Sequence, residues 1–237
     1  MTQEYYSNGK LLLTAEYAVL EGALALAVPT RFGQTLKITE RTAPSISWSS
    51  LAHDGSVWFQ TELAIDTISK QMDADLGSVV GTLFYILGQA QKLNPLFLND
   101  GKGYSVETKL GFPQDWGLGS SSTLISNIAY WANVDPYALL KNTFTGSGYD
   151  IACARHHSAI FYQLRPKVAV VKEIAFDPPF KDALFFVHLN KKQNSREGIA
   201  AFQKREINTL DLIKNITQIT QSIATCTKLA DFEALLT

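Results

Sequence analysis

Three observations predict that the sequence folds as an α+β protein. Residues 5–60 contain short strand-like runs separated by turn residues. The segment from Leu76 to Leu93 instead has apolar residues at helical spacing. A further strand signal and a further helical face then lie on either side of a glycine–serine loop near the middle of the chain. The chain has 237 residues, which is enough for one large domain or two small ones.

In the first half, strands are expected around residues 11–13, 23–28 and 35–39, and near Trp48, Val57 and Phe59. The helix predicted over Leu76 to Leu93 should end before Pro95, which cannot continue it. Alternation of apolar and polar residues over 104–110 then predicts another strand.

In the second half, apolar residues from Leu124 to Ala132 form one helical face, and Asp135-Pro136 is a typical start for a short helix. Residues 168–174 and 183–189 are expected to be paired strands, and apolar residues from Ile207 to Ile223 form a helical core stripe. A domain boundary is plausible near residues 163–167. The last residues, 230–237, look like the middle of a helix, so part of the natural protein is expected to be missing from this sequence.

Composition excludes several classes of function. The chain is 46% hydrophobic with a net charge of −1, which argues against nucleic acid or an anionic membrane as the main partner. Cys153 and Cys226 have no metal-like spacing and are expected to be free thiols of a reducing compartment. There is no signal-peptide pattern and no apolar run of the length that spans a bilayer. These features predict a soluble, cytoplasmic protein.

The glycine–serine loop, WGLGSSSTL over residues 116–124, is the first chemical signal. A glycine-rich turn before a helix exposes backbone N–H groups at the positive end of the helix dipole, where phosphate binds well. The sequence matches neither the P-loop pattern nor G-x-G-x-x-G. On the loop alone, an ordinary helix start capped by its own serines is an equally good interpretation.

Two other stretches change that balance: SNGKLLLTAEYAVLEG over residues 7–22 and GSGYDIA over residues 146–152. Together with the loop, they resemble the three ordered motifs of the GHMP small-molecule kinases, of the GYDIA type. The chain departs from the family pattern at Asn8, Ala15 and Tyr17, where the family has proline, glycine and histidine. The glycine-rich C-terminal motif of the family is not found in this sequence.

The resemblance implies a two-lobed GHMP kinase fold, with an N-terminal lobe like ribosomal protein S5 domain 2 over 1–165 and an incomplete ferredoxin-like lobe over 166–237. It also implies ATP and Mg²⁺ as cofactors and a small molecule as the binding partner, with a homodimer as the assembly to test. The implied activity is that of a mevalonate kinase. Phosphomevalonate kinase and a non-catalytic metabolite-binding homologue are the alternatives.

The resemblance also assigns roles to residues. Lys10 and Asp150 match the catalytic pair, although a solvated lysine and a helix N-cap are the plain alternatives. The nucleotide phosphates would be held by the loop residues Gly117, Leu118, Gly119, Ser120, Ser121 and Ser122, and Mg²⁺ by Ser121. No acidic residue lies between Asp135 and Asp150, so a second metal ligand stays open. The acceptor would lie near Glu16, Tyr17, Ser195 and Arg196, although a solvated, basic helix start is an equally good interpretation of residues 190–196.

Overall fold

The computed structural model describes residues 1–68, 77–144, 146–166, 168–189, 195–205 and 208–237, except for the side chains of 195–197. The described chain divides into two compact units that are each discontinuous in sequence. Unit 1 comprises Met1–Gly9, Arg31–Gln114 and Leu118–Arg155, and unit 2 comprises Lys10–Thr30, Asp115–Gly117 and His156–Thr237. The boundary predicted between residues 165 and 166 stays a prediction.

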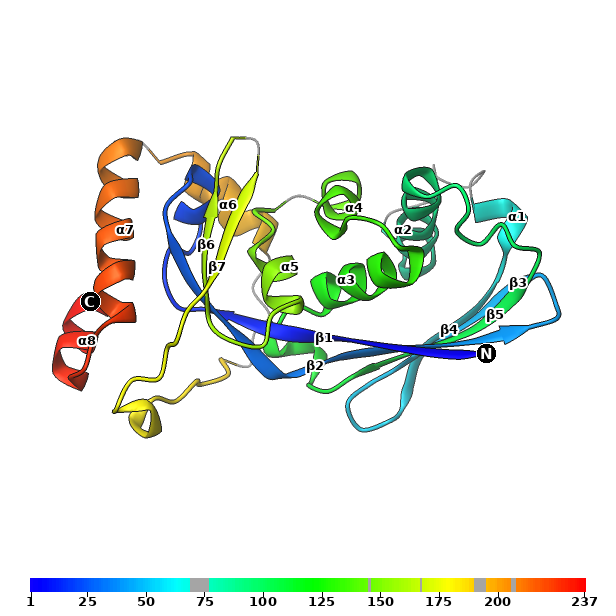
Figure 1. Ribbon diagram of the computed structural model, residues 1–237, viewed down its shortest axis with the longest axis horizontal. Coiled ribbons are helices and arrows are strands. Elements are labelled where there is room, and N and C mark those ends of the chain that lie inside the picture. The colour runs from blue at the N-terminus through cyan, green and yellow to red at the C-terminus, as the bar shows by residue number, and fades with distance from the viewer. Residues whose placement is uncertain (69–76, 145, 167, 190–194, 206–207) are drawn as a thin grey trace. The chain divides into compact units, whose positions relative to one another are not determined.

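The strands confirm the α+β class. Within the described residues, six strands are neighbours in the hydrogen-bonded order β4-β3-β5-β2-β6-β7, and a seventh, β1, pairs with β2. Figure 1 shows these strands. Their bounds are β1 Thr2–Leu12, β2 Ala25–Arg41, β3 Ser45–Leu51, β4 Val57–Ala64, β5 Gly103–Leu110, β6 Ile160–Leu164 and β7 Ala169–Glu173. The pairing of β3 with β5 is parallel, whereas β2 is antiparallel to both β5 and β6. The two strands predicted over 23–28 and 35–39 are therefore one strand, β2.

Unit 1 places its helices over its strands. Figure 1 shows α2 (Val79–Leu93) and α3 (Ser120–Ala132) together over one face of these strands. The shorter helices are α1 Ile65–Ile68, α4 Pro136–Thr143 and α5 Tyr149–Ala154. Trp48 of β3, Leu87 of α2 and Ile128 of α3 are all buried in one core cluster, as expected when apolar helix faces pack on a sheet.

Side-chain caps fix the starts of α2 and α4 in unit 1. Asp135 accepts hydrogen bonds from the backbone N–H groups of Tyr137 and Ala138, and Pro136 occupies the first turn of α4. Ser78 caps α2 by accepting from the N–H of Gly81. The short helix predicted from Asp135-Pro136 is confirmed. The helix predicted over Leu76 to Leu93 is confirmed from Val79 onward, and Leu76 lies outside the described residues.

Unit 2 contains β6, β7 and the N-terminal part of β2 with four helical segments after them: η3 Lys181–Ala183, α6 Ser195–Gln203, α7 Thr209–Ala224 and α8 Leu229–Leu236. A 3₁₀ turn, η1, spans Ala18–Glu21, and another, η2, spans Gln114–Trp116. Ile223 of α7 is buried, and the hydroxyl of Thr220 donates to the carbonyl of Leu24. Ile207 lies outside the described residues. No helix in the described parts of the chain is long and apolar enough to cross a lipid bilayer.

The strand predicted over 183–189 is wrong. Residues 184–189 have no regular structure after η3, and Phe185 and Val187 are about four-fifths exposed. β7 pairs with β6 rather than with this segment. Aromatic and β-branched residues favour a strand, but a strand also needs a neighbour to satisfy its backbone groups, and no described strand pairs with residues 184–189.

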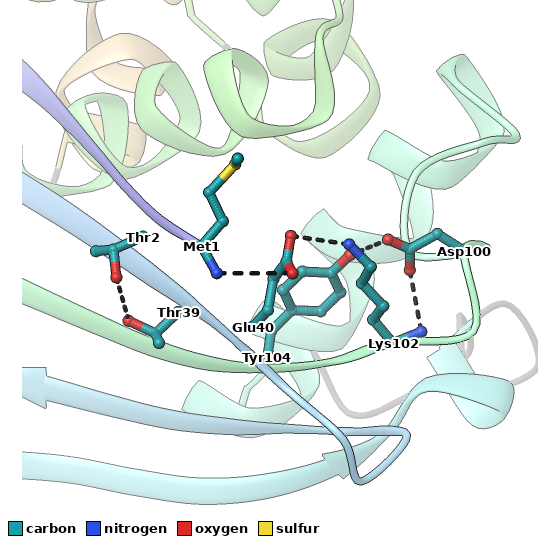
Figure 2. Close-up of polar contacts among 7 residues, drawn as sticks. All are labelled: Met1, Thr2, Thr39, Glu40, Asp100, Lys102 and Tyr104. Atoms are coloured by element: carbon teal, nitrogen blue, oxygen red, sulfur yellow. Dashed lines mark hydrogen bonds and ion pairs between the residues drawn. The ribbon is translucent and has the colours of Figure 1, made fainter.

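In unit 1, a polar cluster links the start of β1, the end of β2 and the start of β5 (Figure 2). Glu40 lies opposite Tyr104 in the β2–β5 register, and its carboxylate is 2.9 Å from the Lys102 ammonium and 3.7 Å from the amino group of Met1. The hydroxyl of Tyr104 donates to Asp100 at 2.6 Å. That hydrogen bond holds the pKa of Asp100 below its ordinary value, whereas burial, followed by the same bond, raises the pKa of Tyr104.

Replacing Tyr104 with phenylalanine is expected to remove a pH-dependent part of the stability. The pKa of Asp100 is lower in the folded protein than in the unfolded chain. The Asp100 carboxylate therefore stabilises the fold above the unfolded pKa of about 3.9, and this stabilisation is lost as pH falls through the folded pKa. Asp100 is exposed, so solvent screening limits the effect to less than about 1 kcal/mol. Urea unfolding of both proteins between pH 6 and pH 2.5 measures it. Tyr5→Phe is the control, because the Tyr5 hydroxyl donates only to Gln3, an exposed neutral side chain.

Candidate functional site

The start of α3 presents unpaired backbone donors. Gly119 precedes the helix with a positive φ of 87°, a conformation that costs glycine little, and it provides no side-chain cap. The first helical hydrogen bond is from the N–H of Thr123 to the carbonyl of Gly119, so the N–H groups of Ser120 to Ser122 precede the helical ladder. Within the described residues, no protein acceptor bonds these three groups. An anion placed there would be stabilised by the donors and by the helix dipole.

A pocket of about 220 Å³ in unit 1 reaches this helix start. Most of its wall is apolar or aromatic, and three polar side chains come from the strands. It is lined by Gln34, Trp48, Ser50, Trp58, Phe59, Gly77, Ser78, Val79, Thr82, Leu83, Ile86, Thr108, Leu110, Gln114, Ser120, Ser121 and Leu124. Trp58 is 43% exposed at the rim, whereas Trp48 is buried and donates from its indole nitrogen to Ser50. Such a mixture of apolar surface and few polar groups is typical of a small-molecule site.

Asp150 lies beside the same helix start. It is the second residue of α5, in the first turn of that helix. The N-cap of α5 is Gly148, which has a positive φ of 87°. The hydroxyl of Ser122 donates to Asp150 Oδ2 at 3.2 Å. The other carboxylate oxygen, Oδ1, is buried and has no hydrogen-bond partner in the described part of the chain. A buried carboxylate oxygen that lacks a donor is costly, so it is suited to a ligand that brings a proton or a cation.

A chain of buried polar side chains supports the first turns of α3. Ser7 of β1 donates to Asn127 Oδ1 at 2.8 Å, and Asn127 Nδ2 donates to the backbone carbonyl of Gln34 at 2.9 Å. The Thr123 hydroxyl lies 2.7 Å from Gln34 Oε1 and 2.9 Å from the carbonyl of Ser120. Satisfied networks of this kind fix one arrangement, because breaking any bond leaves a buried group unpaired. The helix that carries the free N–H groups is therefore held to β1 and β2.

Lys10 belongs to unit 2, where its ammonium donates to the carbonyl of Gly117 at 3.2 Å. This bond ties the end of β1 to the loop just before α3. Asp150 belongs to unit 1, so the predicted approach of Lys10 to Asp150 stays a prediction.

Glu16 and Tyr17, which are predicted to lie near the phosphoryl-acceptor molecule, belong to a strained turn in unit 2. Ala15 and Tyr17 have positive φ values of 66° and 60°, which is uncommon for residues with a side chain and is frequent at functional sites. The Tyr17 ring contacts Phe202 of α6, and a side chain at Gly198 would collide with the Tyr17 hydroxyl. Glu16 between them is exposed.

Ser195 and Arg196 form the first turn of α6, the same helix that Tyr17 contacts. Their side chains lie outside the described residues. The described part of unit 2 thus brings Tyr17 to the helix that carries both residues, while their contact with an acceptor stays a prediction.

The sequence did not indicate the pocket residues on β2, β3 and β4. Gln34, Ser50 and Trp58 stand on separate strands. The antiparallel pairing of β3 with β4 brings Ser50 and Trp58 together, and β5, which pairs with both β2 and β3, connects them to Gln34. One available signal is Trp58, a large aromatic residue beside the exposed Val57 near the start of a short strand.

No protein-family model matches the chain, and no curated protein matches it in sequence. Solved structures do match its fold. Mevalonate kinase from Methanococcus jannaschii is 15% identical with a TM-score of 0.69, and the match covers 100% of this chain and 77% of that protein. Phosphomevalonate kinase from Streptococcus pneumoniae, solved with phosphomevalonate and AMPPNP, is 16% identical with a TM-score of 0.61 over 99% and 77%.

Galactokinase from Lactococcus lactis, solved with galactose, is 14% identical with a TM-score of 0.62 over 99% of this chain and 72% of its own. The chain has the GHMP-kinase fold. The fold predicted from the three motifs is thereby confirmed across nearly the whole chain, at identities that establish the fold alone.

Proposed function

We propose that this GHMP-fold protein is an ATP-dependent small-molecule kinase, which transfers a phosphoryl group to a hydroxyl or phosphate of its acceptor. The observation that carries the proposal is the pocket that reaches Ser120 and Ser121 at the start of α3, where the N–H groups precede the helical ladder, with Asp150 bonded to Ser122 beside them. Phosphoryl transfer depends mostly on positioning and charge stabilisation, and a helix N-terminus next to a carboxylate supplies both.

The pocket suggests how a nucleotide would bind. Its apolar part, with Trp58 and Phe59, suits a flat purine base, because aromatic side chains stack on bases. Its other end, at Ser120 and Ser121, suits the triphosphate, because backbone N–H groups and serine hydroxyls donate to phosphate oxygens. The Lys10 bond to Gly117 would hold the loop before these residues.

The donor set fits a magnesium ion bound together with ATP. Mg²⁺ is usually held by one or two protein oxygens with phosphates and waters, rather than by a cage of protein ligands. The exposed hydroxyl of Ser121, which lines the pocket at the start of α3, is a suitable oxygen. The described residues contain no group of three or more His, Cys, Asp or Glu side chains placed for a metal, which agrees with binding through the nucleotide. When bound, the ion would neutralise charge on the transferring phosphoryl group.

In the reaction, the acceptor oxygen attacks the γ-phosphorus of ATP, and the bond to the β–γ bridging oxygen breaks to release ADP. For a hydroxyl acceptor, Asp150 takes the proton of that hydroxyl, and Ser122 holds the carboxylate in place by its bond to Oδ2. We assign to the Lys10 ammonium the role of stabilising the negative charge that develops on the transferring phosphoryl group.

The leading acceptor is mevalonate, and phosphomevalonate is the alternative; both are substrates named for proteins of this fold. An acidic acceptor suits the predicted contact with Arg196 and Ser195 at the start of α6. A non-catalytic, metabolite-binding role is favoured by one observation, the departures at Asn8, Ala15 and Tyr17 in the first motif.

A coupled assay of ADP release tests these functions with the full chain, Mg²⁺ and ATP. The acceptors are mevalonate, phosphomevalonate, homoserine and galactose, each compared with a reaction that lacks acceptor. Acceptor-dependent ADP release supports the kinase and names its substrate. Saturable ATP binding without turnover on any acceptor would favour the non-catalytic role, and absence of ATP binding would contradict both.

Trp58→Ala is expected to weaken ATP binding by roughly ten-fold or more, because loss of one aromatic–base stack costs about 1–3 kcal/mol. Isothermal titration calorimetry measures the dissociation constant. Val57→Ala is the matched control: Val57 is the preceding residue of β4, is 55% exposed and does not line the pocket. Equal affinities of the two variants for ATP would contradict the placement of the base against Trp58.

A further inference from the structure

Gln34 is a buried polar side chain in the wall of the pocket. Only one of the two polar atoms of its side-chain amide makes a hydrogen bond within the described protein. It is 5% exposed, comes from β2 and lines the pocket together with Ser120 and Ser121. Its Oε1 lies 2.7 Å from the Thr123 hydroxyl, while no described residue bonds the other atom of the amide. A buried amide group with one unused end in a pocket wall is available to a ligand.

The number of protons in the network decides which amide atom faces the pocket. The Thr123 hydroxyl lies within hydrogen-bond distance of both Gln34 Oε1 and the carbonyl of Ser120, but it has a single proton to donate. The amide nitrogen and oxygen have nearly the same shape, so the network assigns them. With the amide turned, Gln34 Nε2 donates to Thr123 and Thr123 donates to Ser120, so both contacts become hydrogen bonds. The acceptor Oε1 is then the end that faces the pocket.

We propose that Gln34 Oε1 accepts a hydrogen bond from a sugar hydroxyl of the bound nucleoside triphosphate. This inference rests on the proposed function. Thr123 places Gln34 beside the first turn of α3, where the phosphates are assigned, and the sugar is the part of a nucleotide adjacent to its phosphates. Phosphate oxygens only accept hydrogen bonds, whereas a ribose hydroxyl donates. Gln34 therefore selects a ribonucleotide over the corresponding deoxynucleotide.

The same residue links the sugar to the phosphate-binding turn. A ribose hydroxyl would bond Gln34, Gln34 bonds Thr123, and Thr123 bonds the carbonyl of Ser120. The backbone carbonyl of Gln34 also accepts from Asn127, one turn further along α3. Gln34 is thus a ligand contact that is itself held rigidly, as a specificity-determining group needs to be.

Calorimetry on the full chain with Mg²⁺ tests the proposal, with ATP, 2′-deoxy-ATP and 3′-deoxy-ATP as probes. The wild-type protein is expected to bind one of the deoxy analogues about ten-fold more weakly than ATP. Gln34→Met keeps the length of the side chain and removes the acceptor, so it should bind ATP about as weakly as the wild type binds that analogue, with no further loss for the analogue. Gln91→Met is the matched control, because Gln91 donates to the carbonyl of Phe97 and does not line this pocket.

Gln34→Glu gives a second variant if the methionine protein does not fold. A carboxylate still accepts from the sugar and from Thr123, so the preference for ATP over the deoxy analogue should persist even if both bind more weakly. Equal binding of ATP and both analogues by the wild type overturns the proposal for Gln34 and leaves nucleotide binding intact. If the wild type binds neither ATP nor the analogues, the proposed function fails, and the role of Gln34 fails with it.

Discussion

Asp150→Asn is expected to lower kcat by about 10²-fold or more while the dissociation constant of ATP changes little, because a positioned base typically contributes 10²–10⁴-fold. Asparagine keeps the shape and can still accept from Ser122, whose hydroxyl bonds Oδ2. It cannot take the proton of an acceptor hydroxyl, and its amide end would replace the buried Oδ1 that lacks a donor among the described residues. Steady-state kinetics with the acceptor found by the screen, together with ATP titration, separates the two quantities.

Asp135→Asn is the matched control for this prediction. Asp135 is also an acidic residue at a helix start, but it caps α4 by accepting from two backbone N–H groups, and asparagine caps helices about as well as aspartate. Its kcat and stability should therefore stay close to those of the wild type. If Asp150→Asn kept more than a tenth of the wild-type kcat, Asp150 would not be the base. A loss of ATP binding in that variant would assign Asp150 to the nucleotide instead.

The parts of the fold that could be predicted are those with local causes. Helix α2 has apolar residues at helical spacing, and α4 has Asp135 and Pro136 at its start, so neighbouring residues determine both. Residues 184–189 show the limit of this reasoning. The strand signals on either side of Pro166 become β6 and β7, which pair with each other, whereas 184–189 has no paired strand in the described chain.

The site shows the same division. Gly119 and the serines after it are contiguous, so the sequence could indicate a phosphate-binding turn. The pocket that reaches this turn is assembled from β2, β3, β4, β5 and α2, so residues such as Gln34 and Trp58 become neighbours only through strand pairing. The roles of Lys10 and Asp150 came from motif resemblance, since no spacing rule connects two residues so far apart in sequence.

The second large effect is expected in stability. Asn127→Leu should lower the free energy of unfolding by about 3 kcal/mol, because each buried group left without a partner costs about 1–3 kcal/mol. Asn127 is fully buried, and its loss would leave the Ser7 hydroxyl without its acceptor and remove a donor from the Gln34 carbonyl. Leucine has the same branched shape and is larger than asparagine, so the substitution creates no cavity. Urea unfolding at pH 7 measures the change, and the melting temperature should fall by roughly 10 °C.

Ser126→Ala is the control for this prediction, since Ser126 precedes Asn127 in α3 and is also fully buried. Its hydroxyl has no hydrogen-bond partner in the described part of the chain, so its removal should be nearly neutral or stabilising. Adding Ser7→Ala to Asn127→Leu should recover about 1 kcal/mol, because it removes the hydroxyl that the leucine leaves unpaired, whereas Ser7→Ala alone should destabilise. If Asn127→Leu cost no more than Ser126→Ala, the buried network would not be what holds α3 to β1 and β2, and the rigid support inferred for Gln34 would be lost.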